Sequence, residues 1–526
     1  MVRILDCTLR DGGYCNNWMF GAQCIYSMVE RLEEANIDII ECGFLTNKVA
    51  SNPASSQHST LDDIRNALPP KNDKCIRVAM VNYGEYNIGQ LENRNSHSPV
   101  DGFRVAFHKK DREQAMDFCR SLAAKGYLVF IQAMVSQNYN DEEFRRLIEE
   151  CNAFNPYAFY IVDSFGMMTR DDVLHYAGLA TKYLNKEVCI GFHSHNNLQQ
   201  SFSNTQALLD FMPQCNVIID ASVDGMGRGA GNLCTELLAK YLNEKFGQHY
   251  QMLPILEIVD LHINPIFQKN PWGYSVAYYV AAAQQCHPNY ATYLIEKQTV
   301  GVRDINTILS RLTDGQKKQF DQAVVEQLYL EHQGRTVAGD DNTERVRQLV
   351  AGRKTLVVAP GRSLVTQRDK IATWIDANRP LTVAVNFVPD DLPADVVFVS
   401  NNKRSAELGD LSGAGMVVAT SNLNLGADAV TVDYTSLYRG DGTPSDNAGI
   451  MCLRLLQNAG VTEVYLAGFD GYRMDLHSNY CSDSMILNAS METLTRRNQI
   501  VGQLMCAINR SMRLHFLTES LYTSFV

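Results

Sequence analysis

Three side chains that bind metal ions well stand at two distant points of this 526-residue chain. Asp11 lies in the stretch DCTLRDGG, directly after the apolar run VRIL, and His193 and His195 end the run EVCIGFHSH. Residues two apart on a strand point to the same face, so the two imidazoles can converge on one point. One carboxylate and two imidazoles suit a divalent ion such as Mn²⁺, Mg²⁺, Fe²⁺ or Zn²⁺ and leave positions open for substrate oxygens and water. Alone, the histidine pair would more often be two ordinary hydrogen-bonded residues.

A metal site of this kind requires strands that bring the three residues together. The first 250 residues alternate short β-branched runs with longer amphipathic ones. Eight such units predict an α/β fold of the TIM (β/α)₈ barrel type, with a doubly wound open sheet as the alternative. Barrel active sites lie at the carboxyl ends of the strands, which is where Asp11 and the histidine pair would stand. The strand candidates are residues 2–6, 37–44, 75–81, 102–107, 127–134, 158–163, 187–195 and 216–223.

The remaining sequence divides into three parts. We expect the barrel over residues 1–255 and a helical extension that closes the barrel mouth over 256–335. A polar linker over 336–353 then leads to a second, Rossmann-like α/β domain over 354–526, where strand-like runs resume at KTLVVAPG.

Composition narrows the function classes. The net charge of −11 makes the chain a poor partner for nucleic acids or anionic membranes. No apolar run approaches the roughly 18 residues of a membrane span. The 14 cysteines are scattered without a CxxC pair, as in a reducing compartment. We therefore expect a cytoplasmic protein, and we expect a homo-oligomer.

The segment GMGRGAGN follows the eighth strand candidate and resembles a dinucleotide fingerprint. Gly225, Gly227 and Ala230 fit the pattern G-x-G-x-x-A. That fingerprint belongs to the first unit of a Rossmann sheet, with an acid about 20 residues further on, and here the next residues are helical. We reject NAD binding. The glycines either let backbone N–H groups approach an anionic substrate or form a structural turn.

Four motifs in order resemble the DRE-TIM metallolyases, over roughly residues 1–290: DCTLRDGG, VDSFGMMTRDDV, GFHSHNNLQQSFSN and DASVDGMGRGAGNLCTELL. This superfamily includes 4-hydroxy-2-oxovalerate aldolase, hydroxymethylglutaryl-CoA lyase and isopropylmalate synthase, and the pyruvate-releasing aldolases are the most similar branch. The resemblance implies that Asp11, His193 and His195 are the metal ligands, with Mn²⁺ or Mg²⁺ favoured. Arg10 matches the arginine that stabilises an enolate, for which a permanently charged, forked guanidinium is suited.

The same resemblance implies further site residues. Asn232 matches an asparagine at or near the metal, and Glu41 would position Arg10 or a water. Asp163 and Ser164 stand at a strand end that usually faces the substrate. Tyr274, in NPWGYSVAYYV, matches an active-site tyrosine of the aldolases, or else it is a packed helical aromatic.

The catalytic base does not follow the pattern. The oxovalerate aldolases have a histidine three positions after the metal-binding aspartate, where this chain has Tyr14. The cysteine that the lyase branch uses is absent from GMGRGAGN. Tyr14 could serve as base only with a lowered pKa or through a metal-bound water.

The expected function is divalent-metal-dependent cleavage or formation of a C–C bond in a 4-hydroxy-2-oxo acid, through a pyruvate enolate. The partners would be a 2-oxo acid and an aldehyde. A Claisen-type enzyme that condenses an acyl-CoA is one alternative. A scaffold barrel joined to a sugar-nucleotide-binding or transferase domain is another.

The second domain weakly resembles bacterial CMP-sugar-dependent sialyltransferases. In type and place, four residues match nucleotide-contacting positions of that fold: Gly361, Ser363, Asn386 and Ser445. Neither His477 nor His515 falls at the position of the transferases' catalytic histidine. The resemblance implies a nucleotide or nucleotide sugar as ligand and a setting in surface-polysaccharide biosynthesis, and a purely structural domain is the alternative.

Overall fold

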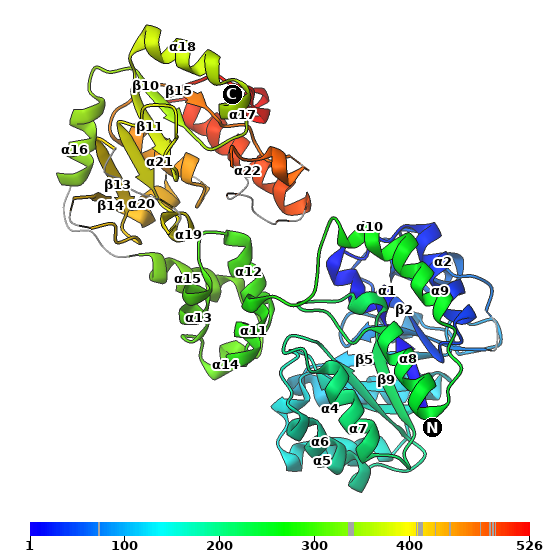
Figure 1. Ribbon diagram of the computed structural model, residues 1–526. Coiled ribbons are helices and arrows are strands. Elements are labelled where there is room, and N and C mark those ends of the chain that lie inside the picture. Colours follow the sequence, from blue (N-terminus) through cyan, green and yellow to red (C-terminus); the bar gives the residue numbers. More distant parts are fainter. Residues whose placement is uncertain are drawn as a thin grey trace. The chain divides into compact units, whose positions relative to one another are not determined.

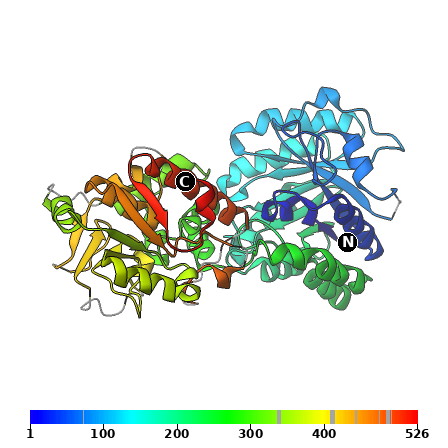
Figure 2. The same ribbon diagram turned by 90° about the horizontal axis from the view of Figure 1, so that it is seen from above.

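The computed structural model divides the chain into two compact units, Met1–Pro288 and Asn289–Val526. It describes residues 1–71, 74–334, 341–406, 408, 414–426, 428–440, 443–473, 475–482, 485, 489 and 491–526. In both units, strands lie between helices (Figures 1 and 2). No helix in these ranges is both long enough and apolar enough to span a membrane.

The first unit is an eight-stranded parallel barrel, as predicted. Strand β1 pairs with β9 on one side and with β2 on the other, which closes the sheet. A two-residue strand, β3 (Gln57–His58), pairs in parallel with the last two residues of β2. The barrel strands are β1 (Val2–Asp6), β2 (Ile39–Leu45), β4 (Ile76–Asn82), β5 (Gly102–Phe107), β6 (Leu128–Ala133), β7 (Ala158–Asp163), β8 (Cys189–Ser194) and β9 (Val217–Ala221).

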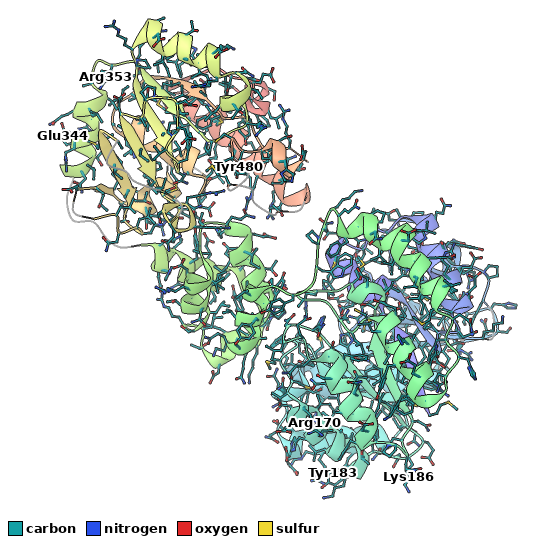
Figure 3. The ribbon with its side chains drawn as sticks, in the orientation of Figure 1. Arg170, Tyr183, Lys186, Glu344, Arg353 and Tyr480 are labelled. Carbon is teal, nitrogen blue, oxygen red and sulfur yellow. The ribbon has the colours of Figure 1, made fainter. Side chains whose placement is uncertain are left out.

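Helices surround this barrel, and their sequences carry recognisable start signals. Thr60, Asn140 and Thr169 each begin a helix with a reciprocal capping box. Figure 3 places Arg170 and Tyr183 at the two ends of one outer helix. The helices are α1 (Thr8–Asp11), α2 (Ala22–Glu34), α3 (Leu61–Ala67), α4 (Arg112–Ala124), α5 (Asp141–Asn152), α6 (Arg170–Tyr183), α7 (Ser201–Phe211) and α8 (Thr235–Phe246).

Apolar residues fill two layers of the barrel unit. An inner cluster that includes Leu5, Phe130 and Ile218 occupies the barrel interior. A larger cluster lies between the strands and the helices and includes Val29 and Leu147. Because alternate strand residues face opposite sides, each strand supplies both layers, and its polar inward residues must find partners inside the barrel.

The boundary between the units falls inside the segment 256–335 that we expected to be one helical extension. Three helices belong to the barrel unit: α9 (Met252–Ile258), α10 (Asn264–Phe267) and α11 (Val276–Ala283). The next four belong to the second unit: α12 (Asn289–Lys297), α13 (Val302–Leu309), α14 (Asp314–Lys317) and α15 (Gln322–Gln333). Within the predicted linker, residues 336–340 lie outside the described residues, and α16 (Asp341–Val350) is helical.

The second unit is built on a parallel sheet with strand order β14-β13-β12-β11-β10-β15-β16. The chain adds strands on one side of β10 and then crosses to the other side with β15, so the topological switch lies between these two. The strands are β10 (Thr355–Val358), β11 (Leu381–Val385), β12 (Val396–Val399), β13 (Met416–Thr420), β14 (Val430–Val432), β15 (Glu463–Ala467) and β16 (Arg513–Phe516). The main helices packed with them are α18 (Arg368–Asn378), α21 (Ala448–Asn458) and α22 (Met491–Asn509). This is the predicted open α/β domain.

Candidate metal centre of the barrel

Asp11, His193 and His195 converge at the carboxyl ends of β1 and β8. One ligand atom from each of the three residues lies within 4.8 Å of the other two. The Nε2 atoms of His193 and His195 lie 3.7 and 3.6 Å from the same oxygen, Oδ2 of Asp11. All three residues are at most 5% exposed. The structure therefore brings together the three residues that the sequence singled out as metal ligands.

The chemistry of these donors fits a divalent ion. Asp11 Oδ2 is buried and accepts no hydrogen bond from the described residues. Nδ1 of His193 lies 2.9 Å from Oδ2 of Asp220, so this nitrogen carries the proton and Nε2 presents a lone pair toward Asp11. A buried carboxylate oxygen without a donor is costly unless a cation balances it. A divalent ion between Asp11 Oδ2 and the two Nε2 atoms would satisfy all three.

A chain of buried charges supports the ligands from inside the barrel. Arg10 donates from Nε to Oε2 of Glu41 at 2.9 Å, and Arg104 donates from Nη1 to the same oxygen at 2.6 Å. Arg104 also forms an ion pair with Asp220, which holds His193. Glu41, Arg104 and Asp220 come from β2, β5 and β9 and are at most 2% exposed. Charges of opposite sign thus alternate across the barrel, and each buried ion has a partner.

These contacts shift the pKa values in the direction that keeps the ions charged. Burial alone would raise the pKa of Asp11, but Arg10 and the two imidazoles outweigh it and hold the pKa well below its usual range. Burial would lower the pKa of Arg10, yet Glu41 and Asp11 outweigh it and raise it. Burial lowers the pKa of His195 to about 3, so its imidazole is neutral and available as a ligand.

A bulge in β2 sets the position of Glu41. The register with β4 shifts between Glu41 and Phe44, and Gly43 between them has φ +120°. A Cβ on Gly43 would lie 1.9 Å from the carbonyl oxygen of Ser56. Only glycine accepts both the backbone angle and this close approach, and bulges of this kind redirect side chains beside active sites.

The loop after β9 presents Asn232 beside the histidines. Asn232 is 2% exposed and bridges to His195 through the backbone. Its Nδ2 donates to the carbonyl of Met226 at 3.2 Å, and its buried Oδ1 accepts no hydrogen bond from the described residues. The side chain oxygen therefore remains available for a ligand, while the glycines of GMGRGAGN let the loop fold tightly around it: a Cβ on Gly227 would meet Asn232 Nδ2 at 2.4 Å.

Asp163 and Ser164 are tied into the backbone at the end of β7. The carboxylate of Asp163 accepts the backbone N–H groups of Met167 and Met168, each at 3.0 Å. Ser164 Oγ accepts the N–H of Val135 at 3.0 Å. Burial raises the pKa of Asp163 to about 7. In this arrangement Asp163 closes a turn, and the substrate role expected for the two residues stays a prediction.

Tyr14 and Tyr274, the two tyrosines expected at the site, differ in their surroundings. Tyr14 packs edge-on against Trp18 and is 42% exposed, with the guanidinium of Arg228 5.4 Å from its ring centre. Loss of solvent around the phenol raises its pKa, against the lowered value that a tyrosine base would need. Tyr274 is 56% exposed, two residues after Trp272, whose indole donates to the carbonyl of Asp224 in the loop after β9.

Two further residues near this centre had no signal in the sequence. Arg228 donates to the carbonyl of Ser164 at 3.1 Å and its charge acts on both Asp11 and His195. His287, which follows α11, packs edge-on against Phe165, and burial lowers its pKa to about 2, with Arg228, His108 and His195 contributing. A histidine thus does approach the centre, from a segment 92 residues after His195.

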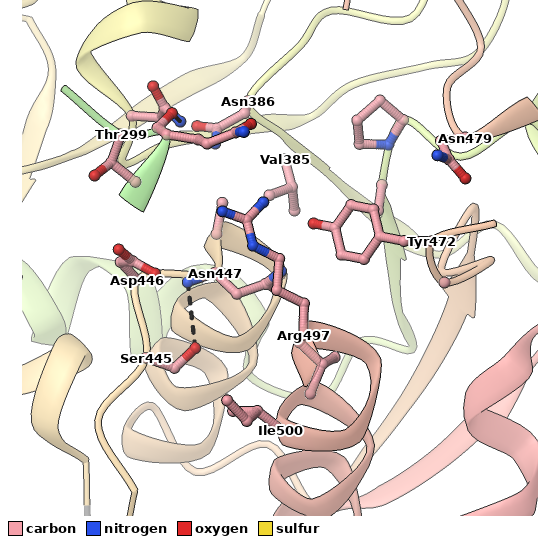
Figure 4. Close-up of a pocket in the computed structure, with 18 of the residues that line it drawn as sticks. Thr299, Val385, Asn386, Ser445, Asp446, Asn447, Tyr472, Asn479, Arg497 and Ile500 are labelled. Carbon is pink, nitrogen blue, oxygen red and sulfur yellow. Dashed lines mark hydrogen bonds between the residues drawn. The ribbon is translucent and has the colours of Figure 1, made fainter. Parts of the chain in front are cut away.

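The residues with an expected nucleotide role lie in the second unit. Gly361, Asn386 and Ser445 line a cavity there, shown in Figure 4. Ser363 donates its hydroxyl to Asp470, and its expected nucleotide role stays a prediction. Gly361 lies against the end of β15, where a Cβ would come within 2.2 Å of the carbonyl oxygen of Gly468.

Comparisons with known proteins show which family and which enzymes the chain resembles. Residues 103–261 match the family model described as HMGL-like. The chain is 28% identical over 254 residues to 4-hydroxy-2-oxovalerate aldolase of Pelotomaculum thermopropionicum, a match that covers 46% of this chain and 70% of the relative. It is 24% identical over 275 residues to oxaloacetate decarboxylase of Mycobacterium tuberculosis, covering 52% and 79%.

Among solved structures, the N-terminal domain of a suspected aldolase from Bacteroides vulgatus is 26% identical, with a TM-score of 0.48. That match covers 56% of this chain and 96% of the other.

Proposed function

Starting from a barrel with an HMGL-like segment over residues 103–261, we propose that this protein is a metal-dependent carbon–carbon lyase of the aldolase type. It would cleave or form a 4-hydroxy-2-oxo acid through the enolate of pyruvate. The observation that carries the proposal is the buried group Asp11, His193 and His195 beside the charged guanidinium of Arg10. The similarity to 4-hydroxy-2-oxovalerate aldolases supports the reaction type.

Asp11, His193 and His195 would hold the ion. When bound, a divalent ion supplies Lewis-acid chemistry to a 2-oxo acid by polarising its keto oxygen. Asp220 keeps the proton of His193 on Nδ1, which leaves the Nε2 lone pair for the ion.

Arg10 would stabilise the negative charge that develops on the substrate oxygen. Its Nε is engaged by Glu41 and its Nη1 lies 3.1 Å from Oδ1 of Asp11, so the guanidinium is held in one orientation. Donors that are held before the reaction stabilise a developing oxyanion without reorganising. Arginine also stays charged throughout, because Glu41 and Asp11 raise its pKa.

Proton transfer at the 4-hydroxyl falls to His287 in this proposal. Its imidazole is neutral and electrostatically coupled to His195, whereas the raised pKa of Tyr14 disfavours a phenolate. A base works best with a pKa near the working pH. Burial lowers the pKa of His287 to about 2, which opposes this role, so the assignment rests on the place of the imidazole against Phe165 and on the His287→Phe measurement below.

Oxaloacetate belongs among the substrates to test. One relative is named as an oxaloacetate decarboxylase, and loss of CO₂ from oxaloacetate also leaves the enolate of pyruvate. A setting in surface-polysaccharide synthesis and a homo-oligomeric state remain part of the proposal and rest on the sequence alone.

The test is release of pyruvate. The purified chain, stripped with a chelator and reloaded with Mn²⁺ or Mg²⁺, is incubated with 4-hydroxy-2-oxo acids and with oxaloacetate, and pyruvate is detected by coupled oxidation of NADH. We expect metal-dependent pyruvate formation that Asp11→Asn abolishes. Asp210→Asn, the same change on the exposed side of α7, is the matched control.

Two further measurements separate the alternatives. Thiol release from acetyl-CoA would identify a condensing enzyme instead. Absence of pyruvate turnover with any divalent ion, in either direction, would contradict the proposal.

The role of His287 as the base has its own test. His287→Phe should lower kcat by about 10²-fold with KM little changed. The exposed His97→Phe serves as its control.

A further inference from the structure

The second unit contains a cavity of about 510 Å³ that the barrel chemistry does not use. Its floor is formed where β10, β11 and β15 end, with Gly361, Asn386 and Gly468 among the lining residues. These ends flank the topological switch of the sheet. Open α/β sheets bind their ligands in the crevice at this point. The cavity is large enough for a small organic ligand rather than a single ion.

The N-terminus of α21 opens into this cavity. Asn447 caps the helix by accepting the N–H of Ile450 at 3.1 Å, and Ala448 and Gly449 line the cavity. The backbone N–H groups of Ala448 and Gly449 have no acceptor among the described residues. The first turn of this 11-residue helix therefore presents free donors and the positive end of the helix dipole, which favour an anion.

Asn386 adds a side-chain donor from the end of β11. Its Oδ1 accepts the N–H of Ser400 at 3.0 Å, which sets the orientation of the amide. The residue is 8% exposed, and its Nδ2 donates to no acceptor in the described part of the chain. Its φ of +59° is a strained angle for a residue other than glycine. A donor that lines the cavity without a protein acceptor, on a side chain held by Ser400 and a strained backbone, is positioned for a ligand atom.

Arg497 supplies a positive charge to the cavity. This residue of α22 donates to the backbone carbonyl of Glu296, and within the described residues no carboxylate lies within 4 Å of it. The neighbouring Arg496 differs, because it pairs with the carboxylate of Glu296 at 3.0 Å. Figure 4 shows Arg497 extending from its helix into the cavity, between Asn447 and Tyr472. One uncompensated guanidinium thus faces the cavity.

The rest of the cavity suits the body of an organic molecule. Tyr472 presents an aromatic ring to it. Asp446 supplies carboxylate oxygens, one of which accepts from the hydroxyl of Tyr329 at 3.4 Å. An aromatic face and an acceptor for hydroxyl groups match a sugar or a nucleoside better than they match a second anion.

We propose that this cavity binds an organic phosphate, whose phosphate group contacts Arg497, Asn386 and the N-terminus of α21. Nucleoside phosphates and sugar phosphates both carry the required chemistry. Of the four residues expected from the sequence, Asn386 contributes a donor to this proposal, whereas the hydroxyl of Ser363 is engaged by Asp470.

The experiment is isothermal titration calorimetry on the full-length chain. The ligands are the 5′-monophosphates of cytidine, uridine, adenosine and guanosine, glucose 1-phosphate, inorganic phosphate, and the unphosphorylated nucleosides and glucose. We expect at least one organic phosphate to bind more than about tenfold tighter than both inorganic phosphate and its own unphosphorylated counterpart. Comparison of the nucleotides with glucose 1-phosphate then shows whether the cavity accepts a nucleoside or a sugar next to the phosphate.

Two substitutions tie the binding to this cavity. Arg497→Gln removes the charge, and Asn386→Asp replaces the free donor with a carboxylate while keeping the acceptor for Ser400. Each should weaken binding by about tenfold or more, because both remove a hydrogen bond to a charged group. Arg510→Gln, just beyond the end of α22, should leave it unchanged. Circular dichroism and the thermal unfolding transition of the second unit check that the variants are folded.

The proposal is overturned if no organic phosphate binds better than inorganic phosphate. It is also overturned if binding is equally strong in both folded variants, or if the unphosphorylated compounds bind as tightly as the phosphates.

Discussion

At the scale of single residues, the barrel contains an unbroken series of buried contacts from Arg10 to His193, ionic as far as Asp220 and closed by a hydrogen bond. The series passes through Glu41, Arg104 and Asp220, and each group contacts the next. Such ions contribute little net stability, because desolvation offsets their attraction, but removing one partner leaves an unpaired buried charge. These contacts fix orientation: they hold the guanidinium of Arg10 and the imidazole of His193 at the same site.

Asp220→Asn tests this orientation. The amide can no longer accept the Nδ1 proton as a charged partner, so the imidazole of His193 loses its preferred tautomer. Replacement of such a partner of a metal-binding histidine lowers metal affinity by roughly 10–100-fold. Titration of the stripped protein with Mn²⁺ measures this. Asp224→Asn, in the adjacent loop, should bind Mn²⁺ as the unmodified chain does.

His58 makes stability depend on pH. It is 2% exposed, its Nε2 lies 3.3 Å from the carbonyl of Cys42, and burial lowers its pKa from 6.5 to about 4. The folded state keeps this imidazole neutral while the unfolded chain takes up a proton below pH 6.5. Its contribution to stability is therefore complete above pH 6.5 and is lost as pH falls toward 4.

We expect that the unfolding free energy of the natural chain relative to His58→Gln falls by about 2 kcal/mol between pH 7.5 and pH 5. Denaturation in urea at both pH values, with a chelator present, measures the difference. Other titrating groups cancel between the two chains. A difference that does not change with pH would contradict the assignment.

At the scale of elements, strand ends and one bulge position the functional groups. Asp11 follows β1 through a single turn of helix, and the histidines lie at the end of β8. Glu41 depends on the irregular stretch of β2, where Gly43 closely approaches Ser56. The position of the functional side chains therefore depends on the backbone of the strands, including the bulge in β2.

Gly43→Ala should disrupt both stability and catalysis. The added Cβ meets a backbone oxygen and the φ of +120° is unfavourable for alanine, so we expect a loss of about 3 kcal/mol or more in unfolding free energy. Gly84→Ala is the control: its φ is +84°, but a Cβ there meets nothing within 4 Å. That change should cost only about 1–2 kcal/mol. Equal losses in the two variants would argue against a role for the close approach.

Much of this element structure was predictable from the sequence. The runs 102–107 and 158–163 match β5 and β7 to the residue, because buried parallel strands are nearly continuous apolar runs. β3 was missed, since its two residues carry too little pattern. Asp11 and the two histidines follow predicted strands, and the carboxyl ends of barrel strands meet at one face, so their proximity could be predicted. Arg228 in a glycine loop and His287 after a helix have no periodicity, so only the tertiary structure brings them near.

At the scale of the whole molecule, each unit has its own apolar core. The barrel unit is filled by the layers inside and outside its strands, and a separate cluster that includes Val357, Leu453 and Met505 fills the second unit. Units with separate cores can unfold in separate steps. Ligands of one unit should then stabilise that unit alone.

Calorimetry of the full chain should show two transitions. Mn²⁺ at about 100 times its Kd stabilises its unit by about 2.7 kcal/mol, which raises that transition by roughly 5–10 °C and leaves the other in place. In Asp11→Asn the Mn²⁺-dependent shift should vanish. A shift of both transitions by the same amount would show that the units unfold together.

The three tryptophans are placed so that the protein carries its own optical probe. Trp18 donates to the carbonyl of Arg10 at 2.8 Å and packs on Tyr14, while Trp272 donates to the loop after β9. Trp374 lies in the second unit, against Tyr465. Two indoles therefore touch the backbone on which the metal centre is built. Loading of that centre should change their emission, and Trp18→Phe and Trp272→Phe would assign the signal to one loop or the other without any added label.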